Sequence, residues 1–195
     1  LTKYPSGGGD VLMGSIITRD NALHMRLKLA HMRLGLGVGM NDVELVLRSL
    51  PSTALRYHAQ DKTARQLAAA LQRQNAVKQL LHPAFASSPG HAHWQQLCAT
   101  PENPAGAAAG IFSVVFDAPQ SQVDDFCNRL QLFKLGYSWG GHISLVMPYA
   151  LDEMRDLGRG AVLPGCLVRL CIGLEEAADL ERDVAQPYGQ AFGHA

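Results

Sequence analysis

Four short apolar runs recur through the second half of the chain and predict β-strands: Val77–Leu81, Gly110–Phe116, His142–Met147 and Leu167–Ile172. Two stretches of helical periodicity, Ser121–Leu132 and Glu175–Gln186, alternate with them. Strands and helices must each bury an apolar side against another element. This alternation therefore predicts a small α/β domain in which helices cover a sheet.

The first fifty residues or so carry a different pattern. Asp10–Thr18 is almost continuously apolar and predicts a short buried strand. Residues 20–33 have helical spacing, and Asn41 followed by Glu44 is typical of a capping box that begins the next helix. Pro51 is expected to end that helix, because proline lacks the backbone N–H that a helix needs.

A longer helix is predicted from Ser52 to about Gln74. One apolar face runs along it, made of Ala64, Leu67, Ala68 and Leu71. We place a domain boundary at its start, which divides the chain into residues 1–51 and 52–195. The first part has little sheet to pack on, so we expect it to be the truncated portion of a larger domain.

Composition and charge argue against several classes of partner. Hydrophobic residues make up 47% of the 195 residues and charged residues 17%, which is typical of a globular chain. Seventeen basic residues balance seventeen acidic ones and no basic block occurs, so nucleic acid and anionic membranes have no electrostatic support as partners. No apolar run approaches the roughly 20 residues that a membrane helix needs. We expect neither a nucleic-acid nor a membrane partner.

Cysteine and histidine give no strong signal. The four cysteines form no C-x-x-C pair; they are Cys98, Cys127, Cys166 and Cys171. Buried thiols in a reducing cytoplasm are the simplest interpretation. His91 and His93 lie in a Ser/Pro/Gly loop without an acidic or cysteine companion, so we expect no metal site there.

The chain opens LTKYPSGGGD, with Lys3 ahead of three glycines. A lysine near a terminus is most often a solvated charge. A phosphate-binding P-loop needs a strand before the glycines and a Gly-Lys-Ser/Thr sequence after them. Here the lysine comes first and the expected strand follows, so the P-loop interpretation fails.

Arg169 lies in the apolar run CLVRLCI, on the side opposite Val168 and Leu170. A guanidinium in the middle of a strand costs several kcal/mol unless it is paired or reaches a wet cleft. On pattern alone, an ion pair within the protein is the favoured interpretation. The other interpretation is a carboxylate receptor, because the planar fork matches a carboxylate with two parallel hydrogen bonds.

A third candidate is the segment LGYSWGGHISLV, residues 135–146. Gly140 and Gly141 allow a close backbone approach, and Tyr137, Ser138 and Trp139 precede them. A tight turn with an anchoring aromatic side chain explains this pattern equally well.

The motifs together resemble a known family. TKYPSGGGD resembles the lysine segment of the Cys/Met-metabolism family of pyridoxal-phosphate enzymes, and GYSWGG resembles the active-site turn of its bacterial cystathionine β-lyases. HPAF…PGHAHW, AGIFSVVF and LVRLCIGLEEAADLERDV are similar to that family's C-terminal domain in order and spacing. The resemblance covers essentially the whole chain.

The resemblance implies the C-terminal half of a fold-type I enzyme: part of the cofactor domain and a small domain whose mainly antiparallel sheet is covered by helices. Lys3 would hold pyridoxal 5'-phosphate covalently, and Thr2 would bind its phosphate. Arg169 would bind the substrate α-carboxylate with help from Ser138 and Trp139. Tyr137 would line the same pocket in a catalytic role.

The resemblance also implies an activity. Lys3 would take the Cα proton of a sulfur amino acid and return a proton to the departing sulfur. Cystathionine would give homocysteine, pyruvate and ammonia, a step of methionine biosynthesis. The relatives imply a cytoplasmic homotetramer with shared active sites. In the family, the residues that bind the pyridine nitrogen, the ring face and most of the phosphate lie upstream, so we expect this chain alone to be inactive.

Some residues depart from the family pattern. Gly8 and Gly9 replace the usual His-Ser, and Ile143 stands where glutamate is common. Relatives that catalyse γ-elimination or γ-synthesis usually carry leucine at the position of Trp139, so Trp139 favours β-elimination. A γ-lyase or γ-synthase remains one alternative, and a non-catalytic binding or assembly domain is another.

Overall fold

In the computed structural model, residues 1–151 and 165–193 are described. The sheet has five strands in the order β1-β2-β5-β4-β3. They are β1 (Val77–Leu81), β2 (Ile111–Phe116), β3 (Lys134–Leu135), β4 (Leu145–Tyr149) and β5 (Cys166–Cys171). All neighbouring strands pair antiparallel except β3 and β4, which are parallel. The prediction of a mainly antiparallel sheet is confirmed.

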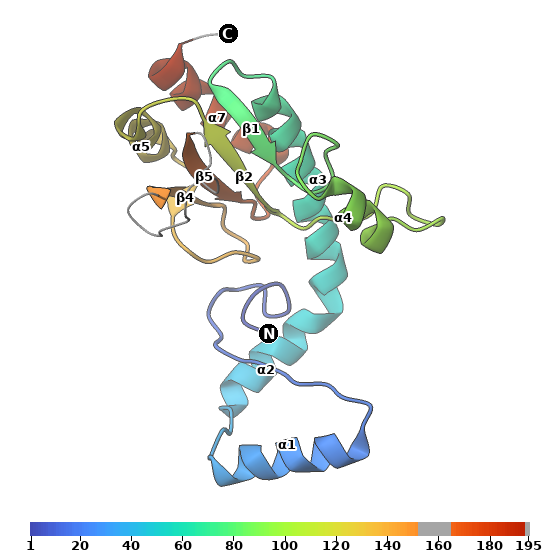
Figure 1. Ribbon diagram of the computed structural model, residues 1–195. Helices are drawn as coiled ribbons and strands as arrows, with labels where there is room; N and C mark the ends of the chain where they lie inside the picture. The colour runs from blue at the N-terminus through green and yellow to red at the C-terminus, as the bar shows by residue number, and fades with distance from the viewer. Residues whose placement is uncertain (152–164, 194–195) are drawn as a thin grey trace.

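Three helices cover one face of this sheet: α3 (Thr53–Gln72), α5 (Gln120–Arg129) and α7 (Ala177–Phe192). Figure 1 shows α5 and α7 beside the strands and α3 rising toward them from the lower part of the molecule. The predicted apolar face of α3 is fully buried, and it joins a core with Phe116, Phe126, Leu170 and Leu180. Burial of this apolar stripe is the main force that stabilises the fold.

The strand register places the Arg169 side chain on the face of the sheet opposite the helices. Arg169 pairs with Ser113 of β2 on one side and with Met147 of β4 on the other. Its neighbours Val168 and Leu170 point into the core. Because side chains alternate along a strand, Arg169 lies on the face that α3, α5 and α7 do not cover.

Residues 1–52 form the lower part of Figure 1. Helix α1 spans Asn21–Arg33, and α2 (Met40–Ser49) continues through a short 3-10 turn, η1 (Leu50–Ser52), into α3. Asp20 begins α1, because its carboxylate accepts hydrogen bonds from the backbone N–H groups of Ala22 and Leu23. The helix expected at residues 20–33 is thus confirmed.

The strand predicted at Asp10–Thr18 is wrong. Residues 10–18 form no strand, and among the large apolar side chains Leu12, Ile16 and Ile17 are 88%, 76% and 91% exposed. A strand is stable only when a neighbour pairs with its backbone. Among the described residues, no strand pairs with this segment.

The expected capping box is also wrong. Helix α2 begins at Met40 after Gly39, and no side chain caps it. Glu44 instead forms an exposed ion pair with Arg48, one turn further along the helix. That pairing is available because residues four apart lie on the same helix face.

Two further elements differ from the expectation. Strand β4 begins at Leu145, not at His142, because Leu174 and Glu175 hold residues 142–144 through hydrogen bonds to His142 O and Ser144. Residues 91–98 were expected to begin in a Ser/Pro/Gly loop, but they form helix α4 (His91–Cys98), which begins after Gly90, a residue with φ +79°.

Of the cysteines, Cys127 and Cys171 are buried as expected, whereas Cys98 is exposed. Burial raises the pKa of the Cys127 thiol to about 12. None of the described helices is both long and apolar enough to cross a membrane.

Candidate active site

Two segments that are far apart in the chain meet beside the uncovered face of the sheet. One is the lysine segment, residues 1–9, which folds into consecutive turns. The other is the Trp139 turn, residues 136–142, which connects β3 to β4. The Lys3 amine donates a hydrogen bond to Ser138 Oγ at 3.0 Å. It also lies 4.2 Å from the centre of the Trp139 ring, at a distance typical of a cation–π contact.

Arg169 reaches the same turn from β5. One of its terminal nitrogens donates to the backbone oxygens of Gly136 at 2.9 Å and Ser138 at 3.3 Å. Its guanidinium carbon lies 5.8 Å from the centre of the Trp139 ring and 5.9 Å from that of Tyr149. Lys3 and Arg169 therefore contact the same indole ring.

The electrostatic balance of this place points to an anionic ligand. Among the described residues, neither Lys3 nor Arg169 forms a salt bridge. The Nε atom of Arg169 is buried, and no described group accepts its hydrogen. A half-buried cation with an unpaired, buried donor atom is costly unless a counter-charge arrives. Within the described residues, the ion pair favoured for Arg169 on pattern alone does not form.

This arrangement fits a negatively charged ligand that reacts with an amine. The Lys3 amine is held by a neutral hydroxyl and not by a carboxylate, so it can bond to a carbonyl carbon. The planar guanidinium of Arg169 has the shape that pairs with a carboxylate through two parallel hydrogen bonds. A pyridoxal phosphate joined to Lys3, with an amino-acid substrate beside it, matches both requirements.

The other two predicted site residues, Thr2 and Tyr137, make their described contacts outside the Trp139 ring. The Thr2 hydroxyl accepts a hydrogen bond from Met13 N–H at 3.1 Å, and this bond ties the lysine segment to residue 13. Tyr137 is 62% exposed, and its ring meets the edge of Tyr149 at 6.3 Å between centres. Their phosphate-binding and catalytic roles stay predictions.

Sequence reasoning missed several residues that support the site. Tyr149 packs near Arg169, and Gln60 on α3 donates to Gly141 O at 2.6 Å. Ser144, just after the Trp139 turn, is held by both carboxylate oxygens of Glu175, at 2.7 and 2.8 Å. The signal that could have flagged Glu175 was its place three residues after the expected strand Leu167–Ile172.

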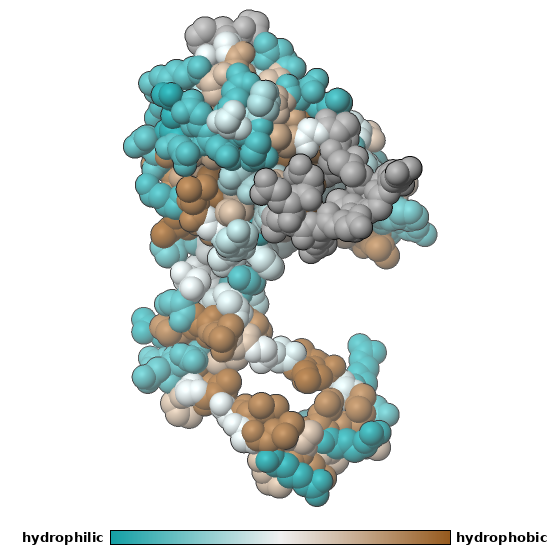
Figure 2. All heavy atoms as spheres, turned by 60° about the vertical axis from the view of Figure 1, so that its left-hand side comes forward, coloured by the Kyte–Doolittle hydropathy of each residue, from teal (hydrophilic) through white to brown (hydrophobic). Residues whose placement is uncertain are grey.

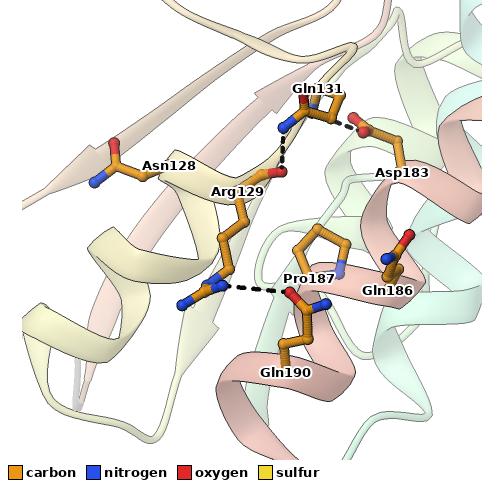
Figure 3. A pocket seen from close by; sticks show the side chains of 7 residues that line it. All are labelled: Asn128, Arg129, Gln131, Asp183, Gln186, Pro187 and Gln190. Atoms are coloured by element: carbon orange, nitrogen blue, oxygen red, sulfur yellow. Dashed lines mark hydrogen bonds between the residues drawn. The ribbon is translucent and has the colours of Figure 1, made fainter.

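Elsewhere, a polar depression of about 500 Å³ lies between α5 and α7 (Figure 3). Its lining residues are Asn128, Arg129, Gln131, Asp183, Gln186, Pro187 and Gln190. The Asp183 carboxylate accepts three backbone hydrogen bonds, from residues 131–133, at 2.7 to 3.2 Å. This carboxylate is thus committed to anchoring the chain after α5, and we assign no chemistry to the depression.

His91 of the histidine pair makes local contacts with its own segment. His91 Nδ1 lies 2.7 Å from Pro83 O, and the His91 ring packs on Trp94. In the part of the chain that the structure describes, no three metal-ligating side chains gather.

The chain is similar to known proteins over nearly its whole length. The chain is 36% identical over 193 residues to a cystathionine beta-lyase of Bordetella avium, covering 97% of this chain and 46% of that protein. It is 32% identical to a cystathionine gamma-lyase of Bacillus subtilis, covering 95% and 48%. A crystal structure of cystathionine gamma synthase from Xanthomonas oryzae pv. oryzae in complex with cystathionine superposes with a TM-score of 0.81 at 30% identity, covering 97% and 48%.

The chain therefore spans about half the length of the relatives it matches. A family profile described as Cys/Met metabolism PLP-dependent enzyme matches residues 1–188. The fold is that of part of a fold-type I enzyme, and the chain belongs to the Cys/Met-metabolism family of pyridoxal-phosphate-dependent lyases and synthases.

Proposed function

We propose that the protein carrying this chain is a cytoplasmic carbon–sulfur β-lyase that cleaves L-cystathionine to homocysteine, pyruvate and ammonia in methionine biosynthesis. The observation that carries the proposal is the meeting of Lys3 and Arg169 on the Trp139 ring, without a counter-charge among the described residues. The 36% identity to a cystathionine beta-lyase supports the same activity.

Arg169 binds the α-carboxylate of the substrate. The carbonyls of Gly136 and Ser138 hold one terminal nitrogen, while the buried Nε keeps a free hydrogen. A planar guanidinium can present two parallel N–H groups to the two oxygens of a carboxylate. This fixed fork orients the Cα–H bond toward Lys3, which is a positioning contribution to the rate.

Lys3 moves the proton. When bound, pyridoxal phosphate supplies an electron sink for the carbanion that forms at Cα. The Lys3 amine takes the Cα proton and afterwards donates a proton to the sulfur that leaves Cβ. Ser138 Oγ, 3.0 Å from the amine, holds it in place between these transfers.

Thr2 and Tyr137 complete the proposal. The Thr2 hydroxyl accepts from Met13 N–H at 3.1 Å and donates to Met13 O at 3.4 Å. It would exchange this long second bond for one to a phosphate oxygen. Tyr137 and Tyr149 form one aromatic wall, and Tyr149 also lies beside Arg169. This wall would contact the sulfur-bearing end of the substrate.

We also propose that residues 1–51 belong to the cofactor domain, residues 52–195 form the small domain, and the protein is a homotetramer with shared active sites. Figure 2 shows brown, hydrophobic side chains gathered on the lower part of the molecule. They include Leu12, Ile16, Ile17, Met32, Leu34 and Met40, each more than half exposed. Apolar surface of this extent is typical of an interface covered by further polypeptide.

The activity is tested by supplying the full-length protein with L-cystathionine and identifying the keto acid. We expect pyruvate together with homocysteine. Formation of 2-oxobutyrate and cysteine would instead assign γ-elimination, an activity carried by the Bacillus subtilis relative. Absence of any keto acid from a cofactor-loaded protein would favour a non-catalytic binding or assembly domain.

The two central side chains have separate tests. Lys3→Ala should abolish the visible absorption band of the lysine-bound cofactor, whereas a band that persists would reassign the lysine. Arg169→Ala should raise KM and cost a few kcal/mol in kcat/KM, the scale of a charge-assisted pair. An unchanged KM with lowered stability would make Arg169 a purely structural residue.

A further inference from the structure

We propose that Tyr4 is a positioning residue for the Lys3 amine, because it ties the lysine segment to the Trp139 turn. This inference rests on the proposed role of Lys3. The claim concerns where the amine is held, since Tyr4 directly follows Lys3 in the chain and contacts the turn that carries Ser138 and Trp139.

The first contact is between the Tyr4 ring and Gly140. Gly140 has φ +74°, a conformation that favours glycine. A Cβ at this position would lie 2.9 Å from Tyr4 N and 3.2 Å from two carbons of the Tyr4 ring. The Trp139 turn can therefore approach the lysine segment only because it has no side chain there.

The second contact is a hydrogen bond at the far end of the ring. Gly110 N–H, just before β2, donates to the Tyr4 hydroxyl at 3.0 Å. Gly110 O accepts from Ile172 N, just after β5. Tyr4 thus reaches the ends of two neighbouring strands, β2 and β5, and β5 carries Arg169. Burial raises the pKa of Tyr4 to about 12, so the hydroxyl stays protonated at neutral pH.

The third contact holds the turn from its other side. Gln60, almost fully buried on α3, donates to Gly141 O at 2.6 Å. Gly140 and Gly141 are therefore fixed between Tyr4 and Gln60. With the turn fixed, the position of Tyr4 sets the separation between the Lys3 amine and its two neighbours, Ser138 and Trp139.

The backbone of the lysine segment has an anchor of its own. Arg56 donates to Tyr4 O at 2.7 Å, and this bond does not involve the Tyr4 side chain. Changing the ring therefore leaves the backbone attached to α3. The effect of such a change on Lys3 then comes from the lost ring and hydroxyl contacts.

The test measures how fast Lys3 is labelled by pyridoxal 5'-phosphate in the full-length protein, followed by borohydride reduction and mass-spectrometric mapping. Lys28, exposed on α1, is the internal reference in the same molecule. We expect Tyr4→Leu to lower labelling of Lys3 relative to Lys28 about tenfold, since displacements of about 1 Å carry effects of this order or larger. Tyr4→Phe keeps the ring on Gly140 and should retain most of the labelling.

Tyr57→Phe is the matched control. The rings of Tyr57 and Tyr4 contact edge to face, with 5.2 Å between their centres, and the Tyr57 hydroxyl lies near the backbone of Ala109. The Tyr57→Phe variant loses a comparable hydroxyl but leaves the contact between Tyr4 and Gly140 unchanged. Labelling of Lys3 should therefore stay unchanged.

Thermal unfolding of each variant separates a loss of protein stability from a displacement of the Lys3 amine. Equal labelling of Lys3 in wild type and Tyr4→Leu, whatever the melting temperature, overturns the role of Tyr4. A wild type in which Lys3 is labelled no faster than Lys28 overturns the proposed role of Lys3 instead. If Tyr4→Leu fails to fold, Tyr4→Phe and Gly140→Ala give the decision: Gly140→Ala should slow Lys3 labelling and Tyr4→Phe should not.

Discussion

Residues 1–50 and residues 53–193 contain similar apolar side chains but bury them very differently. In the second region, the faces of α3, α5 and α7 close over a sheet and leave Leu67, Val114, Phe116 and Phe126 essentially inaccessible. In the first region, Val11 and Val46 are the buried large apolar side chains, and α1 buries no residue. Figure 2 makes the contrast visible as brown surface on the lower part and mostly teal surface above.

The difference shows that an apolar pattern needs a complementary surface before it becomes a core. The first region is held by a few specific contacts of the lysine segment, through Arg56, Tyr4 and Met13. The second region is held by an extensive apolar interior. Substitutions should therefore affect stability by different mechanisms in the two regions.

The largest contrast is expected between Phe126→Ala and Ile17→Ala. Phe126 is fully buried, so its truncation should lower the free energy of unfolding by about 3–5 kcal/mol. Ile17 is 91% exposed and should change it by less than about 0.5 kcal/mol. Urea unfolding of the 195-residue chain measures both, and similar losses would mean that residues 10–18 are packed in solution.

Measuring stability against pH compares a buried histidine of the second region with an exposed histidine of the first. Burial, with a contribution from Arg65, lowers the pKa of His82 from 6.5 to about 4. Between pH 6.5 and about 4, His82 is protonated in the unfolded chain but not in the folded chain. The free energy of unfolding should therefore fall as the pH drops through this range, by on the order of 3 kcal/mol.

His82→Gln should flatten this part of the stability profile. His24→Gln, at an exposed position on α1, is the control and should leave the slope unchanged. A slope that persists in His82→Gln would assign the acid sensitivity to other groups.

The smallest expected difference in stability loss is between Gly7→Ala and Gly9→Ala. Both glycines have positive φ, +69° and +76°, so each alanine costs about 1 kcal/mol of backbone strain. At Gly7 the new Cβ also meets the Arg56 guanidinium, whereas at Gly9 it enters open space. Chemical denaturation should show Gly7→Ala as the more destabilised variant by about 1–2 kcal/mol. Equal losses would mean that Arg56 moves aside freely.

The second region could be predicted well from the sequence. Strand β1 matches its predicted bounds, and β2 and β5 begin within one residue of theirs. Periodicity works there because each apolar run packs against another part of the same chain. At Asp10–Thr18 the same kind of run gave a wrong strand, because its pairing depends on a neighbour that local pattern cannot reveal.

For the site, the sequence by itself determined the identity of the chemical groups: an amine at residue 3, a guanidinium at residue 169 and the hydroxyl and indole of residues 138 and 139. Only the tertiary structure brought them together, by packing the lysine segment on Gly140 and by orienting Arg169 away from the core. The physical reason is that residue type fixes what a group can bind, whereas distance between residues 135 or more positions apart depends on long-range packing.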